Sequence, residues 1–137
     1  MTIHKSTKSE KEKVKEIITD ILEKREEILF SYIHGSFIEN DFRDIDIAVY
    51  LKNKKRFLKY ELNLEREIED VVGYPADVRV LNQSPLSFRF NVIKNGILLF
   101  SNDENIRCDF ESLGIVEHHD FDYQMKNYRK EAMGIEI

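Results

Sequence analysis

The hydrophobic residues in the first third of the chain change from helical to strand-like spacing. Apolar side chains recur every three or four positions from Val14 to Leu22, which predicts a helix from about Glu10 to Glu27. Residues 1–9, which precede the predicted helix, are mostly polar, and we expect them to be flexible. Residues 28–34 then form a compact apolar and aromatic run, which predicts a buried strand.

The segment from Asp44 to Leu51 alternates between two kinds of side chain. Such alternation is typical of a β-strand, because successive side chains point to opposite faces of the sheet. One face carries Ile45, Ile47 and Val49. The other carries Asp44, Asp46, Ala48 and Tyr50. The segment therefore predicts a strand with one purely apolar face and with two carboxylates at the start of the other.

Helices and strands continue to alternate through the remainder of the chain. A helical stripe consists of Phe57, Tyr60, Leu64, Ile68 and Val71, and ends before Gly73-Tyr74-Pro75. The following elements are a strand over 76–81, a helix from Ser84-Pro85 to Asn95-Gly96, a strand over 97–100, and helical segments interrupted at Gly114, the last from about His119 to Met133. This order indicates one α/β domain over residues 10–137.

Composition narrows the class of protein. The 137 residues suffice for a single domain, and the net charge is −5. Residues 101–137 carry nine acids and four bases, so they account for the whole net charge. Because the chain is acidic overall, binding of nucleic acid through bulk charge is disfavoured. The lone Cys108 suits a reducing compartment, and we expect it to pack as a small hydrophobe. Without an apolar leader or a membrane-length apolar run, the sequence predicts a soluble cytoplasmic protein.

Three acids are placed where a metal ion could bind. Asp44 and Asp46 lie two apart on the same strand face, about 7 Å from one another at Cα. Asp77 begins the next strand, and its carboxylate can face the first two if the strands are neighbours. Three converging carboxylates repel one another unless cations lie between them, and Mg²⁺ prefers oxygen ligands. The pattern therefore predicts a magnesium site that could hold a pair of ions for phosphoryl transfer.

Gly35 and Ser36 are candidates for phosphate binding. Glycine lets the backbone approach a ligand closely, and a helix N-terminus with a serine hydroxyl can hold an anion. A second interpretation is structural, because Ser36 and Glu39 have the spacing of a capping box. Together with the three acids, the phosphate interpretation is favoured.

These residues resemble a known family. His34-Gly35-Ser36, followed after seven residues by Asp44-Ile45-Asp46 and later by Asp77, is similar to the DNA polymerase beta-like nucleotidyltransferase superfamily. The segments 77–85 and 95–100 more narrowly resemble the minimal nucleotidyltransferases (MNT), and the resemblance covers about residues 10–130. The stretch between Ser36 and Asp44 is shorter than in the commoner form and lacks its Arg-Gly pair.

The resemblance implies a mixed sheet flanked by helices and transfer of AMP from ATP with Mg²⁺, two ions being expected. It implies that Asp44, Asp46 and Asp77 are catalytic metal ligands and that Gly35 and Ser36 bind the nucleotide. The minimal group commonly consists of antitoxins that adenylylate a tyrosine of a HEPN-type toxin encoded nearby, which is the expected partner. The alternatives are a non-catalytic antitoxin that masks its partner by contact, and a transferase acting on a small molecule or RNA.

Several other polar residues have simpler interpretations. Arg79 shares a strand face with Asp77, and an ion pair between them is the default. The basic run 52–59 is more typical of a solvated surface than of a binding site. His118 and His119 are adjacent and diverge on a helix, so we expect no zinc site there. His34 is expected to be packed or hydrogen-bonded near the acids.

Overall fold

The computed structural model describes residues 2–53 and 57–133, with side chains described as far as residue 127. The helices are α1 (Lys8–Glu23), α2 (Phe57–Val72), α3 (Leu86–Asn95) and α4 (Glu104–Met133), with a short 3₁₀ turn η1 (Ser36–Ile38). The strands are β1 (Ile28–His34), β2 (Ile45–Leu51), β3 (Ala76–Val80) and β4 (Ile97–Ser101). The α/β class is confirmed, and the predicted order of elements is confirmed as far as β4.

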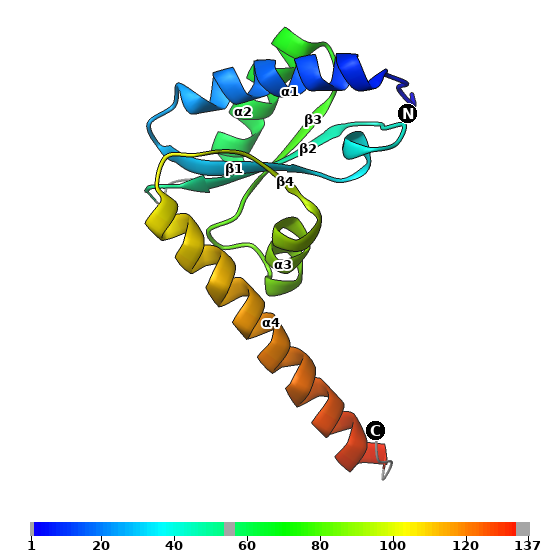
Figure 1. Cartoon of the computed structure of the whole chain (residues 1–137), viewed down its shortest axis with the longest axis vertical. Helices are drawn as coiled ribbons and strands as arrows, with labels where there is room; N and C mark the ends of the chain where they lie inside the picture. The colour runs from blue at the N-terminus through cyan, green and yellow to red at the C-terminus, as the bar shows by residue number, and fades with distance from the viewer. Residues whose placement is uncertain (1, 54–56, 134–137) are drawn as a thin grey trace.

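The four strands form one mixed sheet in the order β3-β2-β1-β4. β1 pairs antiparallel with both β2 and β4, whereas β2 and β3 are parallel. Figure 1 shows α1 and α2 on one side of the sheet and α3 and α4 on the other. The parallel pair brings the first residues of β2 and β3 to the same end of the sheet, where β1 also ends.

The alternation along β2 divides the core into two clusters. Ile45, Ile47 and Val49 pack with α1 and α2 in the larger cluster. Ala48 packs on the opposite face with Val92 of α3. Tyr50 of β2 and Phe110 of α4 lie against that smaller cluster. The predicted two faces of β2 are confirmed, although the second face is covered as well. Val71, assigned to the buried stripe of α2, is 58% exposed, because the stripe follows Leu64 and Ile68 to Val72 instead.

The N-terminal region differs from the prediction in its boundaries. α1 begins at Lys8, two residues early, because Thr7 forms the capping box with Glu10. It ends at Glu23 rather than at Glu27, since the chain turns there to enter β1. Within the segment expected to be flexible, His4 exchanges two backbone hydrogen bonds with Phe42. The flexibility itself stays a prediction.

The second half of the chain also contains corrections. Ser84 does not cap α3: its hydroxyl donates to the Val80 carbonyl oxygen at 2.6 Å, and Pro85 is the N-cap residue. α4 is continuous through Gly114, so the predicted interruption and the separate last helix are wrong. A Cβ on Gly114 would lie 2.8 Å from Ile93 Cδ1, so this glycine permits close packing of α4 on α3. Cys108 is exposed, contrary to the expectation that it packs.

The outer edge of β3 is covered by carboxylates of α2. Glu69, Glu65 and Glu61 accept hydrogen bonds from the backbone N–H groups of Ala76, Val78 and Val80 at 2.8–2.9 Å. Glutamates spaced four apart share one helix face and so match alternate residues of the strand. These bonds satisfy an edge that would otherwise be open to another strand. In the part of the chain described, no helix is long and apolar enough to cross a membrane.

Candidate metal and nucleotide site

The three predicted acids come together at one end of the sheet. Asp46 and Asp77 are direct partners in the parallel register of β2 and β3, and Asp44 immediately precedes β2. Each offers a carboxylate oxygen within 4.8 Å of the others, and all three side chains are half-buried. Neighbouring parallel strands therefore produce the convergence that the sequence only made possible.

Asp46 is the acid whose ionisation is most disturbed. Burial, and after it the charges of Asp44 and Asp77, raise the pKa of its carboxyl to about 6, while Arg79 acts in the opposite direction. The Arg79 Nε donates to Asp77 Oδ1 at 3.1 Å, as the ion-pair interpretation predicted. Because the Arg79 side chain is 60% exposed, this pair leaves the repulsion among the acids largely in place.

The donor set fits a hard divalent cation. It consists of carboxylate oxygens, which Mg²⁺ prefers, and one oxygen of each acid lies within 4.8 Å of the others. Burial is the first cause of the raised pKa of Asp46, and the second is the negative charge of Asp44 and Asp77, which a cation would offset. Asp44, Asp46 and Asp77 are thus the residues here that could hold such an ion.

Gly35 shapes the site in a way that its motif alone did not reveal. It has a φ of +79°, and an added Cβ would overlap the Oδ2 atom of Asp46. This glycine therefore allows the carboxylate to lie directly against the backbone that leads into η1. Ser36 follows and is exposed, and no side-chain hydrogen bond caps η1, so the capping-box interpretation is not supported.

His34 lies beside the acids, as expected. It is opposite Asp46 in the β1–β2 register, is buried, and packs edge-on against Phe88 of α3. Burial lowers the pKa of its imidazole, against the raising effect of the Asp77 and Asp44 charges. A neutral ring at this position adds no positive charge that would compete with a bound cation.

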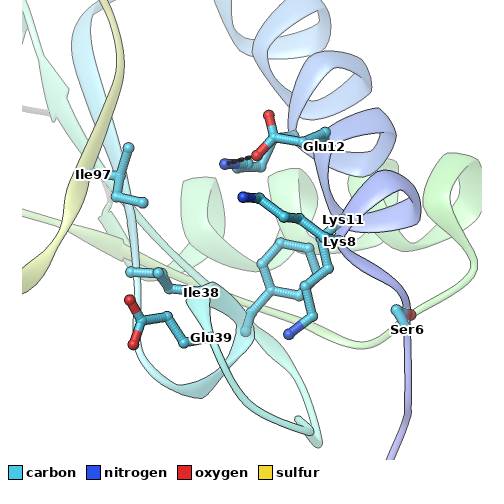
Figure 2. Close-up of a pocket in the computed structure, with 9 residues that line it drawn as sticks. Ser6, Lys8, Lys11, Glu12, Ile38, Glu39 and Ile97 are labelled. Carbon is cyan, nitrogen blue, oxygen red and sulfur yellow. Dashed lines mark ion pairs between the residues drawn. The ribbon is translucent and has the colours of Figure 1, made fainter.

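A separate pocket of about 450 Å³ lies on the α1 side of the sheet (Figure 2). It is lined by Ser6, Lys8, Lys11, Glu12, Lys15, Phe37, Ile38, Glu39 and Ile97. Two of its lysines already have partners: Lys11 Nζ donates to the Asn40 carbonyl oxygen, and Lys15 pairs with Glu12, both at 2.6 Å. None of the three acids lines it, so its size does not make it the nucleotide site. The sequence interpretation had not singled out these lysines, although their helical spacing was visible.

The remaining candidates have structural positions. Lys52 and Lys59 are exposed, as the surface interpretation predicted, and residues 54–56 of the basic run lie outside the described part of the chain. His118 lies inside α4 rather than at a helix start, with its ring stacked on Phe90 at 3.6 Å between centroids. The His119 ring is 6.3 Å from it and nearly perpendicular. The two rings therefore do not form a metal site together.

Several solved structures share this fold. A chain of the complex between tri-AMPylated Shewanella oneidensis HEPN toxin and MNT antitoxin matches with a TM-score of 0.71 at 16% identity, covering 90% of this chain and 98% of that one. The MntA-HepT toxin–antitoxin structure matches at 0.65 and 15%, covering 93% and 99%. A toxin–antitoxin structure with AMP-PNP matches at 0.69 and 16%, covering 88% and 98%. At these identities the likeness shows the fold.

The sequence itself supplies the family. No curated protein matches the chain. The family model described as "Polymerase beta, Nucleotidyltransferase" matches residues 16–105, which span from α1 to the start of α4 and include the three acids together with Gly35 and Ser36. The match extends over more than half of the chain, and the mixed sheet with its acids at one end agrees with it. This protein therefore belongs to the polymerase beta nucleotidyltransferase family.

Proposed function

We propose that the chain transfers AMP from ATP to a tyrosine hydroxyl of a HEPN-type toxin and so acts as its antitoxin. The observation that carries the proposal is the convergence of Asp44, Asp46 and Asp77 in a member of a nucleotidyltransferase family. The choice of reaction and partner is supported by the similar structures, which include an AMPylated HEPN toxin with an MNT antitoxin and a complex with AMP-PNP. We place the reaction in the cytoplasm, where ATP is available.

The three acids would divide the chemistry among them. Asp44 and Asp46 would hold two Mg²⁺ ions together with the triphosphate, and Asp77 would complete the ligands nearest the acceptor hydroxyl. When bound, the ions supply charge neutralisation and align the attacking and leaving oxygens. The acceptor oxygen forms a bond to the α-phosphorus as the bond to the β-phosphate oxygen breaks, and pyrophosphate leaves. Asp77 would help to take up the hydroxyl proton.

The entrance to η1 would position the rest of the triphosphate. Gly35 brings the backbone against Asp46, and the exposed Ser36, which follows it, would donate its hydroxyl to a β- or γ-phosphate oxygen. Arg79 is paired with Asp77 and mostly exposed, so it can exchange that partner for a phosphate without large rearrangement. These contacts would orient the α-phosphorus toward the acceptor.

The test is transfer of label from α-labelled ATP to the toxin encoded beside this chain's gene. Label on the toxin is expected with Mg²⁺, and it should disappear with EDTA and with Asp44→Ala. Asp70→Ala removes an exposed acid of α2 away from the site and should leave transfer unchanged. Inhibition of the toxin without any label would instead establish the non-catalytic antitoxin, and label on RNA or a small molecule would establish a different acceptor.

A further inference from the structure

α4 continues well beyond the element that supports it. Its middle packs on α3, where Gly114 meets Ile93 and Glu117 lies 3.6 Å from Arg89. α3 begins at Leu86, and Leu86 and Ser87 line a pocket of about 300 Å³ together with His118, Phe121 and Asp122 of α4. Figure 1 shows the last turns of α4 extending away from the sheet and the other helices. Isolated helices are marginal in water, so this length of helix is expected to have a use outside the body.

One side of α4 presents apolar residues to solvent. Leu113, Val116 and Tyr123 are 55%, 55% and 68% exposed, and their spacing of three and seven places them on one side of the helix. The residues that face α3, such as Gly114 and His118, lie on another side. We call Asp109, Leu113, Val116, Asp120 and Tyr123, which follow one another at intervals of three or four, the α4 stripe. Exposed apolar residues of this density indicate a protein-binding surface.

Charge decides what kind of partner the α4 stripe fits. Both of its charged residues, Asp109 and Asp120, are acidic and exposed. Of the described bases beside the stripe, Arg107 is paired with Glu104 and Glu111, and Arg89 is paired with Glu117. Lys126 is exposed and lies beyond the end of the stripe. Two parallel copies of α4 in register would bring Asp109 and Asp120 of one copy near the same acids of the other, which is unfavourable. A partner with an apolar strip flanked by lysine or arginine is complementary.

The α4 stripe is also on the side of the sheet where the acids lie. Asp46 and Ala48 share one face of β2, and Ala48 packs against Val92 of α3. α4 packs on that same helix, so a protein held along α4 is on the same side of the sheet as Asp46. Holding the acceptor there would raise the effective concentration of its hydroxyl group at the site.

From these observations we infer that the α4 stripe is the docking surface for the acceptor protein, which presents a basic, partly apolar surface to it. The inference rests on the proposed function for the identity of the acceptor. It adds that recognition lies outside the acid site and depends on α4. Binding should therefore need neither ATP nor an intact site.

The experiment measures binding of the toxin encoded beside this chain's gene to the full-length chain without ATP, in the Asp46→Ala background so that no transfer occurs. The Asp109→Lys/Asp120→Lys variant is expected to bind the toxin at least tenfold more weakly. The chain that keeps both aspartates should bind the toxin more weakly as the salt concentration is raised. Val116→Asp/Tyr123→Asp, which breaks the apolar part, should weaken it similarly. Glu16→Lys/Asp20→Lys reverses two exposed acids of α1 and is the matched control, expected to bind as before.

Unchanged binding by both α4 variants, with unchanged helicity and melting temperature, overturns the inference, as does failure of the toxin to bind the chain that keeps both aspartates. A chain that sediments as a dimer and becomes monomeric in the α4 variants also overturns it, because the occupant is then a second copy. Failure of the proposed function looks different: the toxin binds through α4, but active chain and ATP leave no label on it.

Discussion

The two faces of the sheet differ in how much apolar surface covers them. Among the residues whose side chains the structure describes, sixteen buried ones form one cluster on the side of α1 and α2, whereas five form the cluster on the side of α3 and α4. The acids belong to the second, thinner face, since Asp46 shares its side of β2 with Ala48. Burial of apolar surface is the dominant stabilising term, so one face supplies most of the stability and leaves the other free to carry an unfavourable cluster of charges.

Gly35 connects the two faces. The chain leaves β1 through this residue, places Phe37 in the larger cluster within two positions, and passes the Asp46 carboxylate on the way. Packing on one face therefore determines where the backbone lies against the acid on the other. Three substitutions test this division, and their effects on the free energy of unfolding should decrease in the order given below.

Ile68→Ala should have the largest effect. Ile68 of α2 is fully buried in the larger cluster, so truncation removes transfer energy and leaves a cavity, and we expect a loss of about 2–5 kcal/mol. Urea unfolding measures it. Val71→Ala on the same helix, at an exposed position, should cost less than about 0.5 kcal/mol. Equal losses would show that α2 does not stabilise the fold through this face.

Gly35→Ala should affect both stability and chemistry. Gly35 has a φ of +79° and a ψ of −163°, a combination essentially confined to glycine, so a residue with a Cβ costs about 1–3 kcal/mol there, and the added methyl displaces the Asp46 carboxylate. Gly73→Ala is a matched control, because Gly73 has a φ of +81° with open space around its Cβ position. We expect similar loss of stability in both variants, but loss of AMP transfer, or of Mg²⁺ binding in a titration, only for Gly35→Ala. Full transfer by Gly35→Ala would show that the close approach of Gly35 to Asp46 is not needed.

Asp46→Asn should stabilise the metal-free protein slightly. The pKa of Asp46 is about 6 in the folded chain, above its ordinary value, so the folded state holds this proton more tightly than the unfolded state. The stability that this proton contributes to the folded state is present at low pH and is lost as pH rises from about 4 through 6. After allowance for screening at a half-buried site, Asp46→Asn should recover about 1 kcal/mol at pH 7.5 and flatten this part of the pH profile.

Thermal melting with and without EDTA between pH 4 and 8 measures the effect. Mg²⁺ should raise the melting temperature of the unaltered protein above pH 6 and raise that of Asp46→Asn less, because the substitution removes one charged ligand. Asp70→Asn at an exposed position is the control and should leave the pH profile as it is. A pH profile that persists in Asp46→Asn would contradict the repulsion assigned to the three acids.

Local patterns in the sequence were enough to predict most elements and the acids themselves. The alternation of β2 assigned Asp46 and Ile47 to opposite faces, and the structure agrees, because residue order alone determines which side of a strand a side chain occupies. The limits of prediction appeared where one element meets another. Gly114 was interpreted as a break, yet it allows α4 to cross α3 closely, and only the position of Ile93 distinguishes these roles.

The sequence by itself thus determined the order of helices and strands, the family-specific residues and the acidic character of the last 37 residues. Only the tertiary structure decided that β2 and β3 are parallel neighbours, and therefore that Asp46 and Asp77 face each other. It also decided that Gly35 lies against Asp46 and that α4 leaves the body as one helix. The physical reason is that strand order and helix crossings depend on contacts between residues far apart in the chain, which local periodicity does not encode.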